Sequence, residues 1–242
     1  MMIKKLAIAL LSLTATAAMA TTYSGNLATG FGGTIGAGSL TLTNSGTTVN
    51  GSLTTGGNFN DGFVIYIDSI AGGASVISSG AGFTDAADNN RGAITNRGLN
   101  TLNLPIAADF AISLLPAQGP FGGLWSLSVG SNLPFVANVN LSPLSATGGP
   151  YTFSFNLADI GLTLGQSFNF VTTYLNGSNA FLSNETLTGT TGLGATNPGT
   201  PSTVTLAGFQ TFSTVAVPEP ATVILLGPAL LGGMFFVRRR RA

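Results

Sequence analysis

The chain has 242 residues, enough for one domain of ordinary size or two small ones, and only 7% of them are charged, against about 25% in typical proteins. Six of the eight basic residues lie at the two ends, so residues 21–216, called the body below, hold two arginines and seven acidic residues and carry a net charge of 2 − 7 = −5. This charge excludes a nucleic-acid-binding surface. The body also has no histidine, cysteine or lysine, and this absence excludes Ser-His-Asp, Cys-His and Ser-Lys catalysis and zinc sites.

The first 20 residues contain the three parts of a secretory signal peptide in the right order. Lys4 and Lys5 form a basic start, residues 6–13 are apolar, and Ala18 and Ala20 flank Met19 as small residues of a cleavage site. We therefore expect residues 1–20 to form a signal-peptide helix that is removed after Ala20. The exported body would then occupy residues 21–216.

Alternation of apolar and polar residues predicts β-strands along the body. Glycine, asparagine, aspartate and proline clusters separate the alternating stretches, which are residues 39–43, 124–129, 135–141, 151–157 and 203–209. Residues 63–67 are a continuous apolar run, which predicts a strand buried on both faces. No stretch has a helical period longer than about a turn, although residues 156–161 are compatible with one turn.

The fold class that follows is all-β, an antiparallel β-sandwich or jelly-roll-like body. Two glycine-rich segments, residues 21–38 and 189–202, are expected to be partly loose or loop-like. Two passages, residues 61–68 and 157–170, resemble exported β-sandwich modules, some of which bind carbohydrate. The resemblance is one of layout and transfers no binding residue.

Few residues of the body are candidates for a site. Asp85 and Asp88 could offer oxygen ligands to calcium, although their spacing is not that of an EF-hand and an ordinary loop is the alternative. Trp125 could stack on a sugar ring or could be buried in the core. A pair of carboxylates could hydrolyse glycosides, but most of the acids have turn-like neighbours, so we predict that none is catalytic and expect no cofactor.

The chain closes on a short motif, an apolar stretch and a basic cluster. Pro218, Glu219 and Pro220 precede residues 221–237, which carry no charge and would rise roughly 25 Å as a transmembrane helix. Four arginines follow and are expected to stay on the cytoplasmic side, namely Arg238, Arg239, Arg240 and Arg241. A plain membrane anchor is one interpretation of residues 217–242.

The order of motif, span and arginine cluster resembles the PEP-CTERM sorting signal of Gram-negative bacteria. This resemblance implies export through the inner membrane, a transient stay in it, and processing near Pro218-Glu219-Pro220 by a membrane protease of the exosortase type. It also implies a final place at the cell surface or in the extracellular matrix, in association with exopolysaccharide and biofilm.

Three functions follow from these observations. The first is a non-enzymatic surface or matrix protein that associates with extracellular polysaccharide. The second is a carbohydrate-binding module with a defined sugar site, which requires exposed aromatic residues or a groove. The third is a glycoside hydrolase, which requires two acids about 5 to 10 Å apart in a cleft. We expect the first.

Overall fold

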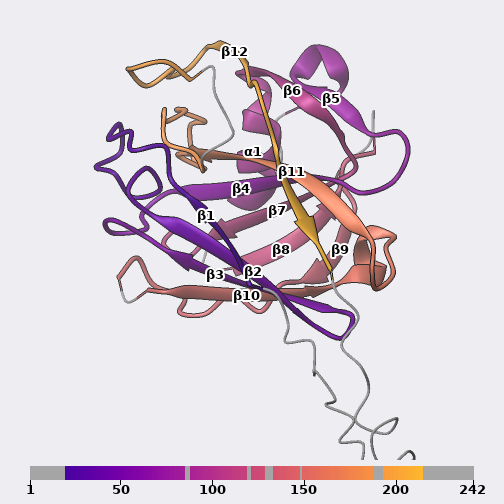
Figure 1. Cartoon of the computed structure of the whole chain (residues 1–242). Coiled ribbons are helices and arrows are strands. Elements are labelled where there is room, and N and C mark those ends of the chain that lie inside the picture. The colour runs from indigo at the N-terminus through magenta and orange to yellow at the C-terminus, as the bar shows by residue number, and fades with distance from the viewer. Residues whose placement is uncertain are drawn as a thin grey trace, which may run out of the picture. The chain divides into compact units, whose positions relative to one another are not determined.

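Three sheets make up the part of the chain that the computed structural model describes, namely residues 20–84, 88–118, 121–128, 133–147, 149–187 and 193–214 (Figure 1). The front sheet has the order β1 (Thr21–Ser24), β2 (Ser39–Ser45), β3 (Thr48–Thr54), β10 (Tyr151–Asn156). The central sheet has the order β13 (Gln210–Ser213), β11 (Ser167–Leu175), β4 (Gly62–Asp68), β7 (Phe110–Leu115), β8 (Phe121–Ser126), β9 (Phe135–Asn138). The small sheet has the order β12 (Thr203–Thr205), β6 (Thr101–Ala108), β5 (Ala74–Ile77).

Strand pairing is antiparallel except between β12 and β6, which run parallel. The described residues contain one short α-helix, α1 (Asn89–Thr95), which packs against β4, β7 and β8. Three 3-10 turns accompany it: η1 (Ser79–Ala81), η2 (Asn96–Gly98) and η3 (Leu157–Ile160). The predicted all-β class is therefore confirmed.

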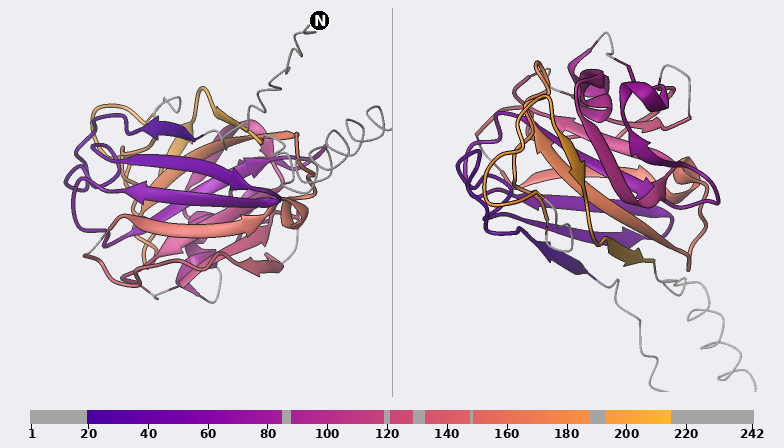
Figure 2. Two further views of the ribbon diagram at one scale, coloured as in Figure 1. Left: turned by 60° about the horizontal axis from the view of Figure 1, so that its bottom comes forward. Right: turned by 90° about the horizontal axis from the view of Figure 1, so that it is seen from above.

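The central sheet is buried on both of its faces, as the views in Figure 2 show. On one face it packs against the front sheet, and on the other it packs against the small sheet and α1, which gives two separate hydrophobic cores. Strand β4 shows the reason at single-residue resolution, because its side chains alternate between the two cores. Phe63, Ile65 and Ile67 enter the first core, whereas Val64 and Tyr66 enter the second. The burial of residues 63–67 in the two cores thus confirms the prediction of a strand buried on both faces.

Sequence and structure differ at several element ends. Strand β12 stops at Thr205 and β9 at Asn138, whereas the alternation extends to residues 209 and 141, and β8 begins at Phe121, earlier than the alternation indicates. The helical turn compatible with residues 156–161 is present as η3, capped by Asn156 and Asp159. Helix α1 was not predicted, because its seven residues are too short to show a helical period.

The first and last described strands lie side by side at one edge of the two large sheets. The Tyr23 hydroxyl of β1 donates a hydrogen bond to the Thr211 carbonyl of β13, over 2.7 Å. Beyond β13, the Thr214 N–H and hydroxyl both donate to the Gln166 carbonyl, and the hydroxyl accepts from the Gly165 N–H. The body is therefore tied down from Thr21 to Thr214.

The predicted signal peptide, the sorting signal and Asp85 lie outside the described residues, apart from Ala20, which is exposed. Within the described residues, no helix is both long and apolar enough to span a membrane.

Candidate functional site

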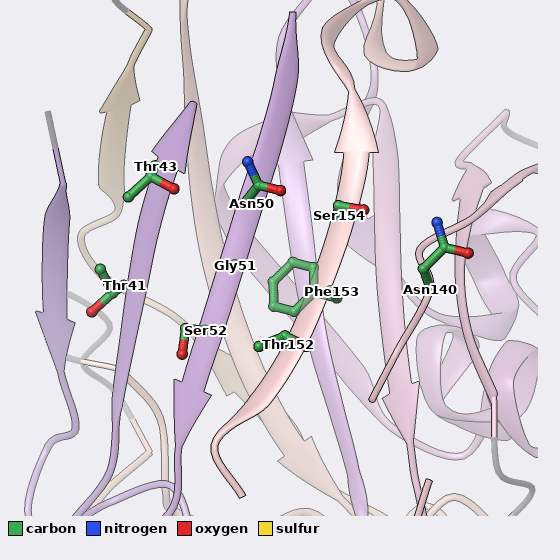
Figure 3. A pocket seen from close by; sticks show the side chains of 9 residues that line it. All are labelled: Thr41, Thr43, Asn50, Gly51, Ser52, Asn140, Thr152, Phe153 and Ser154. Carbon is green, nitrogen blue, oxygen red and sulfur yellow. The ribbon is translucent and has the colours of Figure 1, made fainter. Parts of the chain in front are cut away.

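Two rows of uncharged polar side chains cross the outer face of the front sheet (Figure 3). The strand register places Thr41 beside Ser52 and Ser52 beside Thr152, which makes the first row. The second row lies two residues further along the strands and consists of Thr43, Asn50 and Ser154. Neighbouring side chains within a row are about 4.8 Å apart, and the rows are separated by about 6.8 Å, since these are the spacings of an antiparallel sheet.

The shallow hollow between the rows, called the trough below, has a volume of about 290 Å³. Its floor is the backbone of Gly51 and Phe153, which face each other between the rows. The Phe153 ring lies against Gly51 on the core side, so close that a Cβ at position 51 would come within 2.2 Å of the ring. A larger residue at position 51 would have to displace the Phe153 ring, and with glycine there no side chain fills the floor.

The polar groups of the trough are largely free. Thr41 hydrogen-bonds to Thr22 and Thr152 donates to the Ser142 carbonyl. Among the described residues, no hydrogen bond engages the side chains of the others, which are Thr43, Asn50, Ser52, Ser154 and Asn140. Hydroxyls and amides both donate and accept, so this surface can bind a ligand that presents hydroxyl groups.

A second hollow adjoins the trough at Asn140, which lines both. It has a volume of about 320 Å³, and its lining is partly apolar: Phe121, Gly122, Leu141 and Leu144, with Asn138 and Asn140. The segment from Asn138 to Leu144 carries most of this lining. It is held on one side by a bridge from Ser142 to β10 and on the other by the Val139 N–H, which donates to the Gly122 carbonyl of β8.

Neither hollow is lined by an ionisable side chain. A surface of this kind cannot supply a general acid, a general base or a cation for a phosphate. Its chemistry is recognition by hydrogen bonds, with apolar contact at one end.

A buried carboxylate lies away from the hollows, at the loops that precede β2. Glu185 is fully buried, and its Oε1 accepts from the N–H groups of Phe31 and Gly33 at 2.5 and 2.9 Å. Its Oε2 accepts from Ile35 and Gly36 at 2.7 and 3.2 Å. The glycine-rich stretch at residues 30–36 thus surrounds the Glu185 carboxylate of the protein itself. Residues 25–38, between β1 and β2, form a loop that these four hydrogen bonds hold in place.

Asp61 and Asp68 have raised pKa values. Burial raises the pKa of Asp61, while hydrogen bonds from Asn176 and Gln118 to its Oδ1 act in the opposite direction. Burial, and next to it the charge of Asp109, raise the pKa of Asp68. Asp109 itself accepts from the N–H groups of Ser69 and Ile70, so its role is to hold a turn. None of these acids lines either hollow.

The structure describes two of the candidate residues from the sequence, Asp88 and Trp125. Asp88 caps α1 by accepting from the Arg91 N–H at 2.8 Å, and it pairs with the Arg91 guanidinium at 2.6 Å. In the described part of the chain, no group of three or more acidic, cysteine or histidine residues is arranged to hold a metal ion. Trp125 is 2% exposed and belongs to the second core, so the sugar-stacking alternative is wrong and the core role holds.

Comparison with known protein families, with curated proteins and with solved structures found no match. The site therefore rests on its own geometry. Sequence reasoning missed it, although one signal was present: the outward positions of residues 39–43 and 151–157 are threonine, serine and asparagine and carry no charge.

Proposed function

We propose that this protein is an exported, non-enzymatic surface or matrix protein that associates with extracellular polysaccharide through the trough. The observation that carries the proposal is the set of unpartnered hydroxyl and amide groups on the outer face of β2, β3 and β10. Polysaccharides present many hydroxyl groups, and each needs a partner that can both donate and accept. The defined trough favours the carbohydrate-binding form of this function over association without a site.

The route to the surface is the second part of the proposal. A signal peptide at residues 1–20 exports the chain, the helix of residues 221–237 holds it in the inner membrane, and an exosortase-type protease processes it near Pro218-Glu219-Pro220. The resemblance of residues 217–242 to a PEP-CTERM signal supports this route. In this proposal, the exported body is sandwich-like or jelly-roll-like. The signal-peptide helix precedes it and the transmembrane helix of the sorting signal follows it.

Hydrolysis is the less favoured function, for a physical reason. A glycosidase needs two carboxylates that face the scissile bond across a cleft. Neither hollow has an acid in its lining, and Glu185, the most buried acid of the described residues, is occupied by four backbone N–H groups.

The test is a glycan array probed with the full chain, solubilised in a detergent without a sugar headgroup. We expect retention on neutral glycans without turnover. Asn50→Ala removes hydrogen bonds worth about 0.5 to 1.5 kcal/mol each, so it should weaken binding about fivefold. Asn60→Ala is the matched control and should leave binding unchanged, because the Asn60 side chain likewise makes no hydrogen bond among the described residues and lines neither hollow. No retention on any glycan, or retention that Asn50→Ala does not alter, would refute the trough as the binding site.

A further inference from the structure

We infer that the ligand is a neutral glycan that carries acetamido groups, with its sugar hydroxyls in the trough and an acetamido group in the second hollow. This inference rests on the proposed function and names the substrate class of the same site. It depends on the second hollow, which differs in chemistry from the trough and is continuous with it through Asn140.

The second hollow combines an apolar wall with amide groups. Leu144 is 51% exposed and Phe121 is half-buried, so both present apolar surface to a ligand. Gly122 keeps the floor low, because a Cβ there would come within 2.8 Å of the Leu141 Cβ. The hollow can therefore receive a small apolar group, which the polar trough cannot favour.

Two amide groups line the second hollow, Asn138 and Asn140, and Asn140 also lines the trough. The Asn140 side chain has no hydrogen-bond partner among the described residues, and the Asn138 Oδ1 is taken by the Asn140 N–H at 2.7 Å, which leaves the Asn138 amide NH₂ to donate. An acetamido group matches this pattern, because its N–H and C=O are next to a methyl group. The amides can bind its polar atoms while the methyl group lies against Leu144 and Phe121.

Charge separates this ligand from related polymers. The body carries −5 and neither hollow contains a cation, so a glycan with carboxylate, sulfate or phosphate groups would be repelled and would find no partner. A deacetylated, cationic glycan would be attracted by the whole body, but its ammonium groups would lose their hydration in the second hollow without a carboxylate to replace it. An uncharged acetamido glycan avoids both costs.

The experiment compares three oligosaccharides of equal length with the same β-1,4-linked backbone, made of N-acetylglucosamine, glucose or glucosamine. Binding to the full chain, in the same detergent, is measured by calorimetry at low and moderate salt. We expect the acetylated oligomer to bind about tenfold more tightly than the glucose oligomer, as one buried methyl group and one added hydrogen bond predict. Binding of the glucosamine oligomer should be weak at moderate salt, because it depends on electrostatic attraction between its ammonium groups and the negatively charged body, which salt screens.

Variants separate the two hollows. Leu144→Ser removes the contact of the methyl group, worth about 0.8 kcal/mol, so it should reduce the preference for the acetylated oligomer to about threefold and leave the affinity for the glucose oligomer unchanged. Leu99→Ser is the matched control, since Leu99 is equally exposed, at 51%, and lines neither hollow. Asn50→Ala should weaken binding of both oligomers by the same factor. Because Leu144 is exposed, the variant keeps its core, and Trp125 fluorescence verifies that it is folded.

The outcomes distinguish this inference from the proposed function. Equal binding of the glucose and acetylated oligomers that still depends on Asn50 overturns the acetamido assignment alone. A tenfold preference that Leu144→Ser leaves unchanged also overturns it. If none of the three oligomers binds, the acetamido assignment fails, and retention on the glycan array decides separately whether the trough binds another glycan.

Discussion

Replacing Glu185 by glutamine tests whether one buried carboxylate holds the loops in front of β2. The substitution keeps the shape of the side chain but turns one of its oxygens into an NH₂ group. Two of the four N–H groups that now point at the carboxylate would then face a donor. Each buried donor left without an acceptor costs about 1 to 3 kcal/mol. The variant no longer buries a charge, which offsets part of this loss, so we expect a net destabilisation of about 3 kcal/mol.

Urea unfolding of the body, followed by the fluorescence of its single tryptophan, measures this effect. With a slope of about 2 kcal/mol per molar, the midpoint should fall by about 1.5 M. Asp88→Asn is the control for the loss of one negative charge: it keeps an oxygen to cap α1 and gives up an exposed ion pair, so its midpoint should change by less than about 0.5 M. A Glu185→Gln variant within about 1 kcal/mol of the natural protein would show that the four hydrogen bonds do not hold the loops.

Three further predictions concern the body and its tail. Because the pKa of Asp61 is raised, the folded protein binds the Asp61 proton more tightly than the unfolded chain does, and the stability of the fold decreases as the pH rises from about 4 through the raised pKa. Asp61→Asn should therefore be more stable than the natural protein at about pH 7 but not at about pH 3. An equal gain at both pH values in urea titrations would contradict this cause. Gly51→Ala should lower the free energy of unfolding by about 2 kcal/mol because its Cβ meets the Phe153 ring, whereas Gly57→Ala, where the nearest atom is 3.5 Å away, should be close to neutral, and equal effects in chemical denaturation would refute the steric argument. Glu219→Ala should leave the exported chain unprocessed; mass spectrometry of the surface protein would refute the sorting route if the natural mature form still ended in the arginine cluster.

The sequence predicted the strands in which apolar residues follow a regular local pattern. Strands β2 and β10 alternate, and β4 is continuously apolar, so their burial follows from local periodicity. Strand β3 did not stand out, because Gly51 occupies a core position without a side chain. Its place is filled by the Phe153 ring of a strand about 100 residues further along the chain, which no local pattern shows.

The roles of charged residues were the hardest to predict, for the same reason. Glutamate is rarely buried, and nothing near Glu185 in the sequence indicates that the backbone of residues 31–36 supplies its partners. Asp88 has a local signal, since aspartate is a common N-cap, but α1 is too short to reveal a helix for it to cap. The trough also required the register between strands, which brings its two rows together from three separate segments.

The attachment of Thr214 to Gln166 and Gly165 has a mechanical consequence under the proposed sorting route, in which the C-terminal tail holds the protein in the membrane. Any pulling force on the tail enters the body at Thr214 and passes first to β13, a four-residue edge strand paired only with β11. The front sheet is joined to β13 by the hydrogen bond from the Tyr23 hydroxyl of β1 to the Thr211 carbonyl, so the load reaches its edge strand β1 before it reaches β2, β3 and β10, which carry the trough. Under tension the body would therefore yield at its tether while the trough kept its shape.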